Sequence, residues 1–298
     1  MKKGEQKRAS LGIIFLVVFI DLVGFGMVLP LLPLYAKSYG ASPFLIGLLA
    51  VSYSGTQLLF NPVWGGISDR IGRRPILLMS LLGAVVFYTL FGWAPSLIWL
   101  FVARLGAGVF AANISTAMAY IADITTIEER TKGMGLIGAA FALGFIFGPA
   151  FGGFLSQYSY SVPGYGAAVL SLTAFLLALV RLPESKPRAG QVSAVSRSLA
   201  AQFKALGETL RQSQVARPML VYFLTVFAFA SMQITFPLFT LELFHFDVVE
   251  NGYLFAFVGV IAVVFQGGLI GRLSKAYGEG PLAIVGTVLS MIALSFLP

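Results

Sequence analysis

The stretch from Leu11 to Tyr35, LGIIFLVVFIDLVGFGMVLPLLPLY, contains a single charged residue, Asp21. A helix needs about 20 mostly apolar residues to cross the hydrocarbon core of a bilayer. A cleaved signal peptide also begins with a basic segment. Here the apolar run is too long for one, contains an acid, and lacks a cleavage site of small residues. We therefore predict that this stretch is the first membrane span.

Eight further apolar blocks of similar length follow, so the sequence predicts nine spans. Charged residues make up 11% of the chain and hydrophobic residues 58%, whereas soluble domains carry about 25% charged residues. This composition excludes a single water-soluble core. The blocks are also too long and too uniformly apolar for the alternating strands of a membrane barrel. The predicted fold is an all-α, polytopic membrane bundle with spans near residues 11–35, 45–67, 76–94, 97–121, 133–157, 163–182, 218–241, 251–271 and 282–297.

The basic residues predict the orientation of the bundle. Of the 20 Lys and Arg residues, 18 lie at the N-terminus or in the loops on its side of the membrane; Lys37 alone lies in a loop opposite, and Arg104 is inside a span. Because Lys and Arg accumulate in cytoplasmic loops, we expect a cytoplasmic N-terminus in the cell (inner or plasma) membrane. The net charge of +8 is thus explained by orientation, and no nucleic-acid partner is expected.

A polar, basic segment divides the chain into three units: a six-span half at 1–182, a cytoplasmic linker at 183–217, and three spans at 218–298. Glycines 19 positions apart begin and end the second span and again the eighth. Transporters are often built from two such repeated halves. We therefore expect a functional protein of about twelve spans, with this sequence stopping partway through its second half.

Apolar residues in the linker recur at helical spacing, which predicts a helix lying on the cytoplasmic membrane surface. A linker without regular structure is the alternative. The residues concerned are Val195, Leu199, Phe203, Leu206 and Leu210.

Two charges fall inside predicted spans, Asp21 in the first and Arg104 in the fourth. From the helical rise, they lie about 15 and 19 Å from the cytoplasmic face. An isolated charge at such depth costs roughly 2.5–3.5 kcal/mol or more, so these residues normally face a cavity and find partners. We predict that Asp21 carries protons and that Arg104 tunes it. A purely structural ion pair is the alternative.

The loop after the second span reads GGISDRIGRR from Gly65 to Arg74, which is similar to the cytoplasmic motif of the major facilitator superfamily. Three other segments resemble motifs of its twelve-span drug:proton antiporters: Asp21 through Pro30 and Pro33, LFVARLGAG at 100–108, and GFIFGPAFGG at 144–153. The resemblance covers the chain from about residue 10 to 298.

This resemblance implies a cytoplasmic gating cluster that latches the two halves together. Its members are Gly65, Asp69, Arg70, Gly72, Arg73, Arg74 and Asp123. The short loops are expected to bring Arg73 and Asp123 into pairing with Asp69. The alternative is that the basic residues only set the topology.

The fifth-span segment supplies the motif associated with antiporters: Gly144, Gly148, Pro149, Gly152 and Gly153. With Ala140, three of these glycines recur every four residues and form a smooth stripe for close packing of another helix. Pro149 is expected to bend the span. Close packing alone would also explain the stripe.

The tetracycline pumps of this family carry titratable or metal-binding groups where this chain has Phe87, Ala262 and Ser290. These departures favour a less polar substrate. Candidate polar groups of the substrate cavity are Gln57, Asn61, Asn113 and Gln233. Each of them is equally explained as a contact between helices.

The expected function is proton-coupled export of small lipophilic compounds. There is no phosphate-binding loop for ATP, no Cys, and one His, His245. We expect no enzyme activity, no cofactor and no metal. The expected partners are the substrate, protons and the lipid bilayer, and the full-length protein is expected to be a monomer. A metabolite or sugar permease and a non-transporting fragment or membrane sensor remain alternatives.

Overall fold

The computed structural model describes residues 3–185, 207–208, 212–265 and 269–295, and every regular element within these ranges is a helix. The predicted all-α membrane fold is thereby confirmed. In chain order the helices are α1 (Lys3–Val28), α2 (Leu31–Ser38), α3 (Pro43–Ile71), α4 (Arg73–Trp93), α5 (Leu97–Val109), α6 (Asn113–Ile124), α7 (Ile127–Ser156), α8 (Val162–Arg181), α10 (Ser213–Phe244), α11 (Val248–Val264), α12 (Ile270–Tyr277) and α13 (Glu279–Ser295).

Seven helical stretches of the described chain are long and apolar enough to cross a membrane, and they match the first seven predicted spans. The eighth and ninth blocks contain shorter apolar helices, Val248–Ala262 and Gly280–Ala293. The described part of the predicted eighth span, 251–271, comprises most of α11 and the start of α12, while residues 266–268 lie outside the described residues, so the continuity of this span stays a prediction.

Two of the spans are broken. The first passes from α1 to α2 at Pro30, which has no N–H to continue the helical hydrogen bonds. The fourth passes from α5 to α6 through residues 110–112. Broken helices within membranes occur where the freed backbone groups find other partners or line a cavity.

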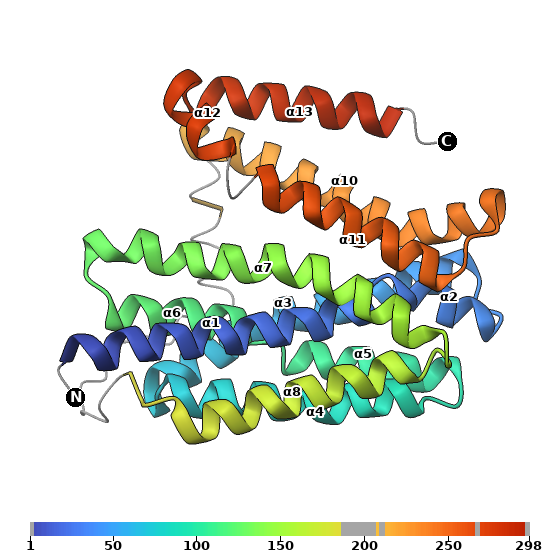
Figure 1. The fold of residues 1–298 in the computed structure, drawn as a ribbon, viewed down its shortest axis with the longest axis horizontal. Coiled ribbons are helices and arrows are strands. Elements are labelled where there is room, and N and C mark those ends of the chain that lie inside the picture. Colours follow the sequence, from blue (N-terminus) through green and yellow to red (C-terminus); the bar gives the residue numbers. More distant parts are fainter. Residues whose placement is uncertain (1–2, 186–206, 209–211, 266–268, 296–298) are drawn as a thin grey trace.

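Helices α1 to α8 form one bundle, α11 packs against α7, and α10 lies beside α11 and contacts α2 (Figure 1). Helix α1 packs against both α7 and α8, while α4 packs against α8 and α3 against α5. Helices α12 and α13 lie beyond α10 and α11 (Figure 1). The amphipathic linker helix predicted at 195–210 falls almost wholly outside the described residues and stays a prediction.

The glycine stripe of α7 is where α1 approaches most closely. A Cβ added at Gly148 would lie 2.6 Å from the Cα of Gly26, and one at Gly152 would lie 2.6 Å from the carbonyl oxygen of Met27. Real Cβ atoms do not come this close to another backbone. The predicted close packing along this stripe is confirmed, and the partner helix is α1.

The neighbouring glycine of the motif faces the second half of the chain. A Cβ at Gly153 would lie 3.1 Å from the Cα of Gly252 in α11. At the same end of the bundle, Lys37 of α2 forms an ion pair of 2.9 Å with Glu242 of α10. The two halves therefore meet tightly at the end of the bundle opposite the basic loops.

Candidate functional site

Asp21 lies in the middle of α1 and interacts with the side-chain amide of Asn113. Asn113 begins α6, directly after the break in the fourth span, and is 4% exposed. Its Oδ1 atom is buried without a hydrogen-bond partner. Of the four predicted cavity residues, Asn113 is therefore the one that the fold places beside the intramembrane acid.

Arg104 does not pair with Asp21, contrary to what their shared depth suggested. Its guanidinium lies over the ring of Tyr53, 4.4 Å from the centroid, and its Nε and Nη1 atoms are buried without hydrogen-bond partners. Among the described residues no ion pair joins Arg104 to Asp21. A guanidinium over an aromatic face is stabilised by the ring quadrupole, more strongly where water is excluded.

Two tyrosines connect the two charges. Tyr53 of α3 and Tyr88 of α4 each interact electrostatically with Asp21 and with Arg104. Neither tyrosine was predicted as a site residue, because a tyrosine in an apolar span has no distinguishing pattern. The arrangement is a polar cluster of an acid, an amide, two phenols and a guanidinium, drawn from five different helices. Tyr88, Arg104 and Asn113 are buried, and Asp21 and Tyr53 are half-buried.

Side chains satisfy the backbone groups freed by the break in the fourth span. Trp64 Nε1 donates to the carbonyl of Val109 at 2.6 Å, and Gln57 Nε2 donates to that of Ala111 at 3.2 Å. Ser80 donates to the carbonyl of Phe110 and accepts from the N–H of Ala112. Gln57, a predicted cavity residue, is thus a contact between helices.

The other two cavity candidates have different surroundings. Asn61 has its Oδ1 buried without a hydrogen-bond partner. Gln233 of α10 is 9% exposed and lines two adjoining cavities between the halves. The structure therefore places Gln233 in a cavity and Asn113 beside Asp21, and it links Gln57 to the broken span.

The larger of these cavities has a volume of about 420 Å³ and lies between α7, α10 and α11. Five of its eleven lining residues are aromatic, and Ala262 also lines it, where the tetracycline pumps carry a histidine. The lining residues include Phe141, Phe145, Tyr222, Phe229, Gln233 and Phe255.

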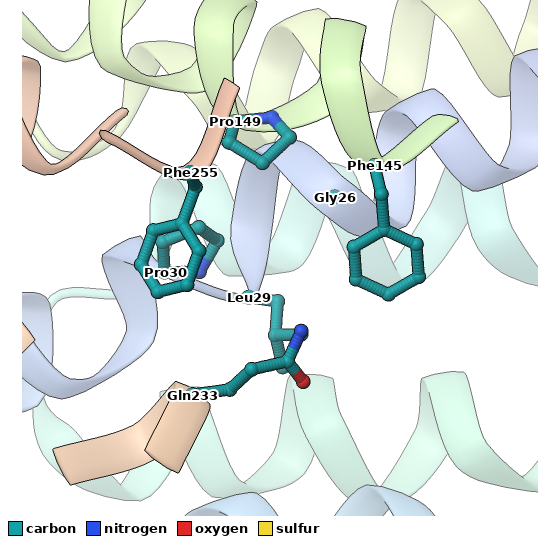
Figure 2. A pocket seen from close by; sticks show the side chains of 7 residues that line it. All are labelled: Gly26, Leu29, Pro30, Phe145, Pro149, Gln233 and Phe255. Carbon is teal, nitrogen blue, oxygen red and sulfur yellow. The ribbon is translucent and has the colours of Figure 1, made fainter. Parts of the chain in front are cut away.

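The smaller cavity has a volume of about 10 Å³ and joins the larger one at the crossing of the halves. Figure 2 shows Gln233 extending from α10 toward Leu29 of the α1–α2 break, with Pro149 and Phe145 of α7 on the other side. Residues far apart in the sequence thus meet at one point.

At the basic end of the bundle, Arg73 links the acidic residues of the predicted cytoplasmic gating cluster. It forms an ion pair of 2.7 Å with Asp69 and one of 3.0 Å with Asp123, and it donates to Ser68. The predicted pairing is present, with Arg73 between the two acids. These described partners of Arg73 all belong to the first half of the chain.

Glu184 completes this cluster and was not predicted. Its carboxylate accepts the backbone N–H groups of Arg73 and Arg74 at the start of α4, at 2.8 and 3.2 Å. An acid at a helix N-terminus is favoured by the helix dipole. Gly72, with φ of 106°, permits the close approach, because a Cβ there would lie 2.4 Å from a carboxylate oxygen of Glu184.

Replacing Arg73 with alanine is expected to lower the free energy of unfolding by about 2 kcal/mol, because two partly buried acids would lose their shared cation. Arg70→Ala is the matched control, since Arg70 is exposed, and should change stability by less than about 0.5 kcal/mol. Thermal unfolding of both purified variants in detergent measures this difference. Equal stability of the two variants would show that the cluster is only a surface feature.

No group of three or more His, Asp or Glu residues suited to a metal ion occurs in the parts of the chain that the structure describes.

The spans, the broken helices and the polar cluster within the spans define a multi-pass membrane transporter fold. The family model described as Major Facilitator Superfamily matches residues 14–298. The chain belongs to this superfamily, and it is a membrane transporter of that class.

Curated relatives of the chain include drug-resistance proteins. It is 35% identical over 279 residues to tetracycline resistance protein, class E, of Escherichia coli, covering 91% of this chain and 67% of that protein. It is 30% identical over 294 residues to multidrug resistance protein 1 of Bacillus subtilis (strain 168), covering 96% and 72%.

Solved structures share the fold. The human organic anion transporter MFSD10 (TETRAN) matches with a TM-score of 0.72 and 24% identity, covering 97% of this chain and 83% of that one. A bacterial homologue of the human lysosomal transporter Spinster matches with a TM-score of 0.68 and 17% identity, covering 91% and 63%.

Proposed function

We propose that this protein exports small lipophilic compounds across the cell membrane in exchange for protons. The observation that carries the proposal is the polar cluster around Asp21, since ionisable groups within membrane spans mark proton and substrate pathways. The similarity to tetracycline and multidrug resistance proteins supports a drug-like cargo. The aromatic wall of the 420 Å³ cavity suits an apolar one.

In this proposal, Asp21 takes up a proton when the cavity opens outward and releases it when the cavity opens to the cytoplasm. Asn113 orients the carboxylate through its amide. Arg104 does not touch Asp21 and acts on it through Tyr53 and Tyr88, which interact with both charges. Such networks of buried polar groups respond as a unit when one member changes charge.

The present conformation corresponds, in the same proposal, to a state closed on the outer side. The Lys37–Glu242 ion pair and the contact between Gly153 and Gly252 hold the halves together there. The Arg73 cluster lies at the cytoplasmic end, where it braces loops of the first half. A latch between the halves at that end, as the family resemblance implied, belongs to a different step of the transport cycle.

The test of export is uptake into inside-out vesicles of a fluorescent apolar compound under an imposed pH gradient. One proton exchanged per compound across one pH unit supports about tenfold accumulation. We expect accumulation that collapses when an ionophore removes the gradient. Facilitated entry that ignores the gradient would instead favour a permease, and the absence of any protein-dependent entry would contradict transport of this class of compound.

The orientation can be tested by labelling, because the chain has no native Cys. A single cysteine at Gly207 in the linker is expected to be accessible only from the cytoplasm, and one at Ser159, in the exposed loop between α7 and α8, only from outside. A membrane-impermeant maleimide on intact cells distinguishes them. Labelling of position 207 but not of 159 in intact cells would reverse the proposed topology.

A further inference from the structure

The break in the fourth span determines the directions of its two polar residues. Arg104 lies in α5 before the break, and Asn113 begins α6 directly after it. The nine positions between them make about 2.5 turns of an ideal α-helix. In an unbroken span the two side chains would therefore point to opposite sides. In the structure both belong to the polar cluster, Arg104 over Tyr53 and Asn113 beside Asp21.

The break needs hydrogen-bond partners from other helices, because α6 cannot cap its own start. The residue before Asn113 is Ala112, which makes no side-chain cap, and alanine is among the poorest N-cap residues. Backbone groups freed within a membrane are costly unless another group pairs with them. A side chain from outside the fourth span must therefore stabilise the break.

Ser80 of α4 is the side chain that pairs with both kinds of freed group. Its hydroxyl donates to the carbonyl of Phe110 and accepts the N–H of Ala112 at 3.1 Å. The same N–H also donates to the carbonyl of Phe110 at 2.8 Å. Trp64 and Gln57 only donate to carbonyls near the break. Ser80 is 2% exposed, so bulk water does not compete for its hydroxyl.

The face of α4 that carries Ser80 is shaped to receive the break. Gly83 lies one helical turn further along the same face, and a Cβ added there would overlap the side chain of Phe110. Phe87, one turn beyond, packs its ring 5.9 Å from that of Phe110. The missing side chain at Gly83 thus lets Phe110 approach closely enough for its carbonyl to reach Ser80.

The position of Asn113 matters because Asp21 has few other polar neighbours. Helix α1 packs mainly against α7 and α8, and neither of these carries a charged residue in its middle. Tyr53 and Tyr88 interact electrostatically with Asp21. Asn113 is the described side chain whose amide interacts with this acid, and it does so because α6 begins where it does.

We propose that Ser80 is a positioning residue for proton exchange, because it holds the break in the fourth span and so keeps Asn113 beside Asp21. The inference rests on the proposed function in taking Asp21 as the proton-carrying group. No described hydrogen bond joins Ser80 to either of these residues, so it acts through the backbone of residues 110–112. Without its hydroxyl, the apolar residues of the break are free to continue the helix, which would turn Asn113 away from the acid.

The test is an infrared measurement of Asp21 in the protein in lipid nanodiscs. Acidification protonates the carboxylate, and the carbonyl stretch of the resulting acid depends on its hydrogen bonds. Asp21→Asn identifies the band by removing it. We expect Asn113→Ala to shift the band and Ser80→Ala to shift it in the same direction. The variant that carries both changes should show no further shift, because Ser80 acts through Asn113.

Ser171→Ala is the matched control for the lost hydroxyl. Ser171 of α8 is 0% exposed and its hydroxyl has no hydrogen-bond partner. The control therefore removes the same atom from an equally buried place without breaking a contact, and it should leave the band unchanged.

A second variant leaves Ser80 in place. Gly83→Ala puts a methyl group against Phe110 and should shift the band as Ser80→Ala does, while favouring the helical state of α4 itself. Gly138→Ala is its control, since no atom lies within 4 Å of a Cβ added there. It should leave the band unchanged.

In the vesicle assay, Ser80→Ala should lower gradient-driven transport about fivefold, the effect of one lost hydrogen bond, and keep compound binding within about twofold. A band that stays at the parent's position in both Ser80→Ala and Gly83→Ala would overturn the inference. So would shifts that add to that of Asn113→Ala, because additive effects indicate independent disturbances.

The two assays together separate this inference from the proposed function. Gradient-driven transport by the parent protein with unshifted bands in the variants leaves export standing and removes Ser80 as a positioning residue. The expected band shifts in a protein that shows no gradient-driven transport support the positioning of Asn113 by Ser80 and remove its connection to export.

Discussion

Asp21→Asn is expected to abolish proton-driven accumulation in vesicles while leaving substrate binding within about twofold of the parent protein. The asparagine keeps the size of the side chain and its hydrogen bonding to Asn113, but it cannot take up or release a proton. Where the parent accumulates a compound about tenfold across one pH unit, the variant should reach an accumulation ratio near one. Uptake under an imposed pH gradient and equilibrium binding of the same compound measure the two quantities.

A matched control is Asp247→Asn, which makes the same chemical change outside the membrane. Asp247 accepts the N–H groups of Val249 and Glu250 at the start of α11, and asparagine caps a helix about as well as aspartate does. It should accumulate the compound as the parent does. Gradient-driven accumulation that persists in Asp21→Asn would mean that the proton travels by another route.

Gly148→Leu is expected to cost about 3 kcal/mol or more of stability, because no space exists for a side chain where α7 meets α1. A Cβ at this position would already lie 2.6 Å from the Cα of Gly26 and 2.9 Å from the carbonyl oxygen of Val23. These are backbone atoms, so the two helices would have to separate along their length. We expect a lower melting temperature or loss of the monodisperse protein in detergent.

The control lies on the same helix. Gly138 is exposed and has no atom within 4 Å of an added Cβ, so Gly138→Leu makes the same substitution without a collision. Its melting temperature should stay close to that of the parent. Equal stability of Gly148→Leu and Gly138→Leu would contradict the close contact between α1 and α7 at Gly148.

The sequence was informative wherever a physical requirement acts along one helix or one short loop. Long apolar blocks must be spans because lipid cannot satisfy an open backbone, and glycines every four residues must lie on one face. Arg73 and its two acids are held by short loops, so their pairing was also predictable.

What could not be predicted depends on the rotation of helices about their axes and on contacts between distant segments. The helical rise gave similar depths for Asp21 and Arg104, but depth does not specify which way a side chain points. In the structure Arg104 turns toward Tyr53 and Asp21 toward Asn113. In the sequence, nothing distinguishes Glu184 from other polar residues that follow a span. Its role depends on contact with Gly72, between α3 and α4, which only the tertiary structure provides.

The break in the fourth span was missed for a related reason. Its residues, Phe110, Ala111 and Ala112, are all apolar, and none of them excludes a continuous helix. The break is stabilised by Trp64, Ser80 and Gln57, which come from two other spans. It also places Asn113 at a helix start beside Asp21, so the environment of the central acid is a consequence of tertiary structure.

If compound and proton exchange through Asp21, a transported compound must itself drive proton movement, and this movement can be measured. Proteoliposomes containing a trapped pH-sensitive dye would receive a transported compound on one side, with no pH gradient imposed. We expect protons to leave the interior as the compound enters it, and we expect Asp21→Asn to show no proton movement. Compound entry by the parent protein without any change in internal pH, or an equal proton flux in Asp21→Asn, would contradict it.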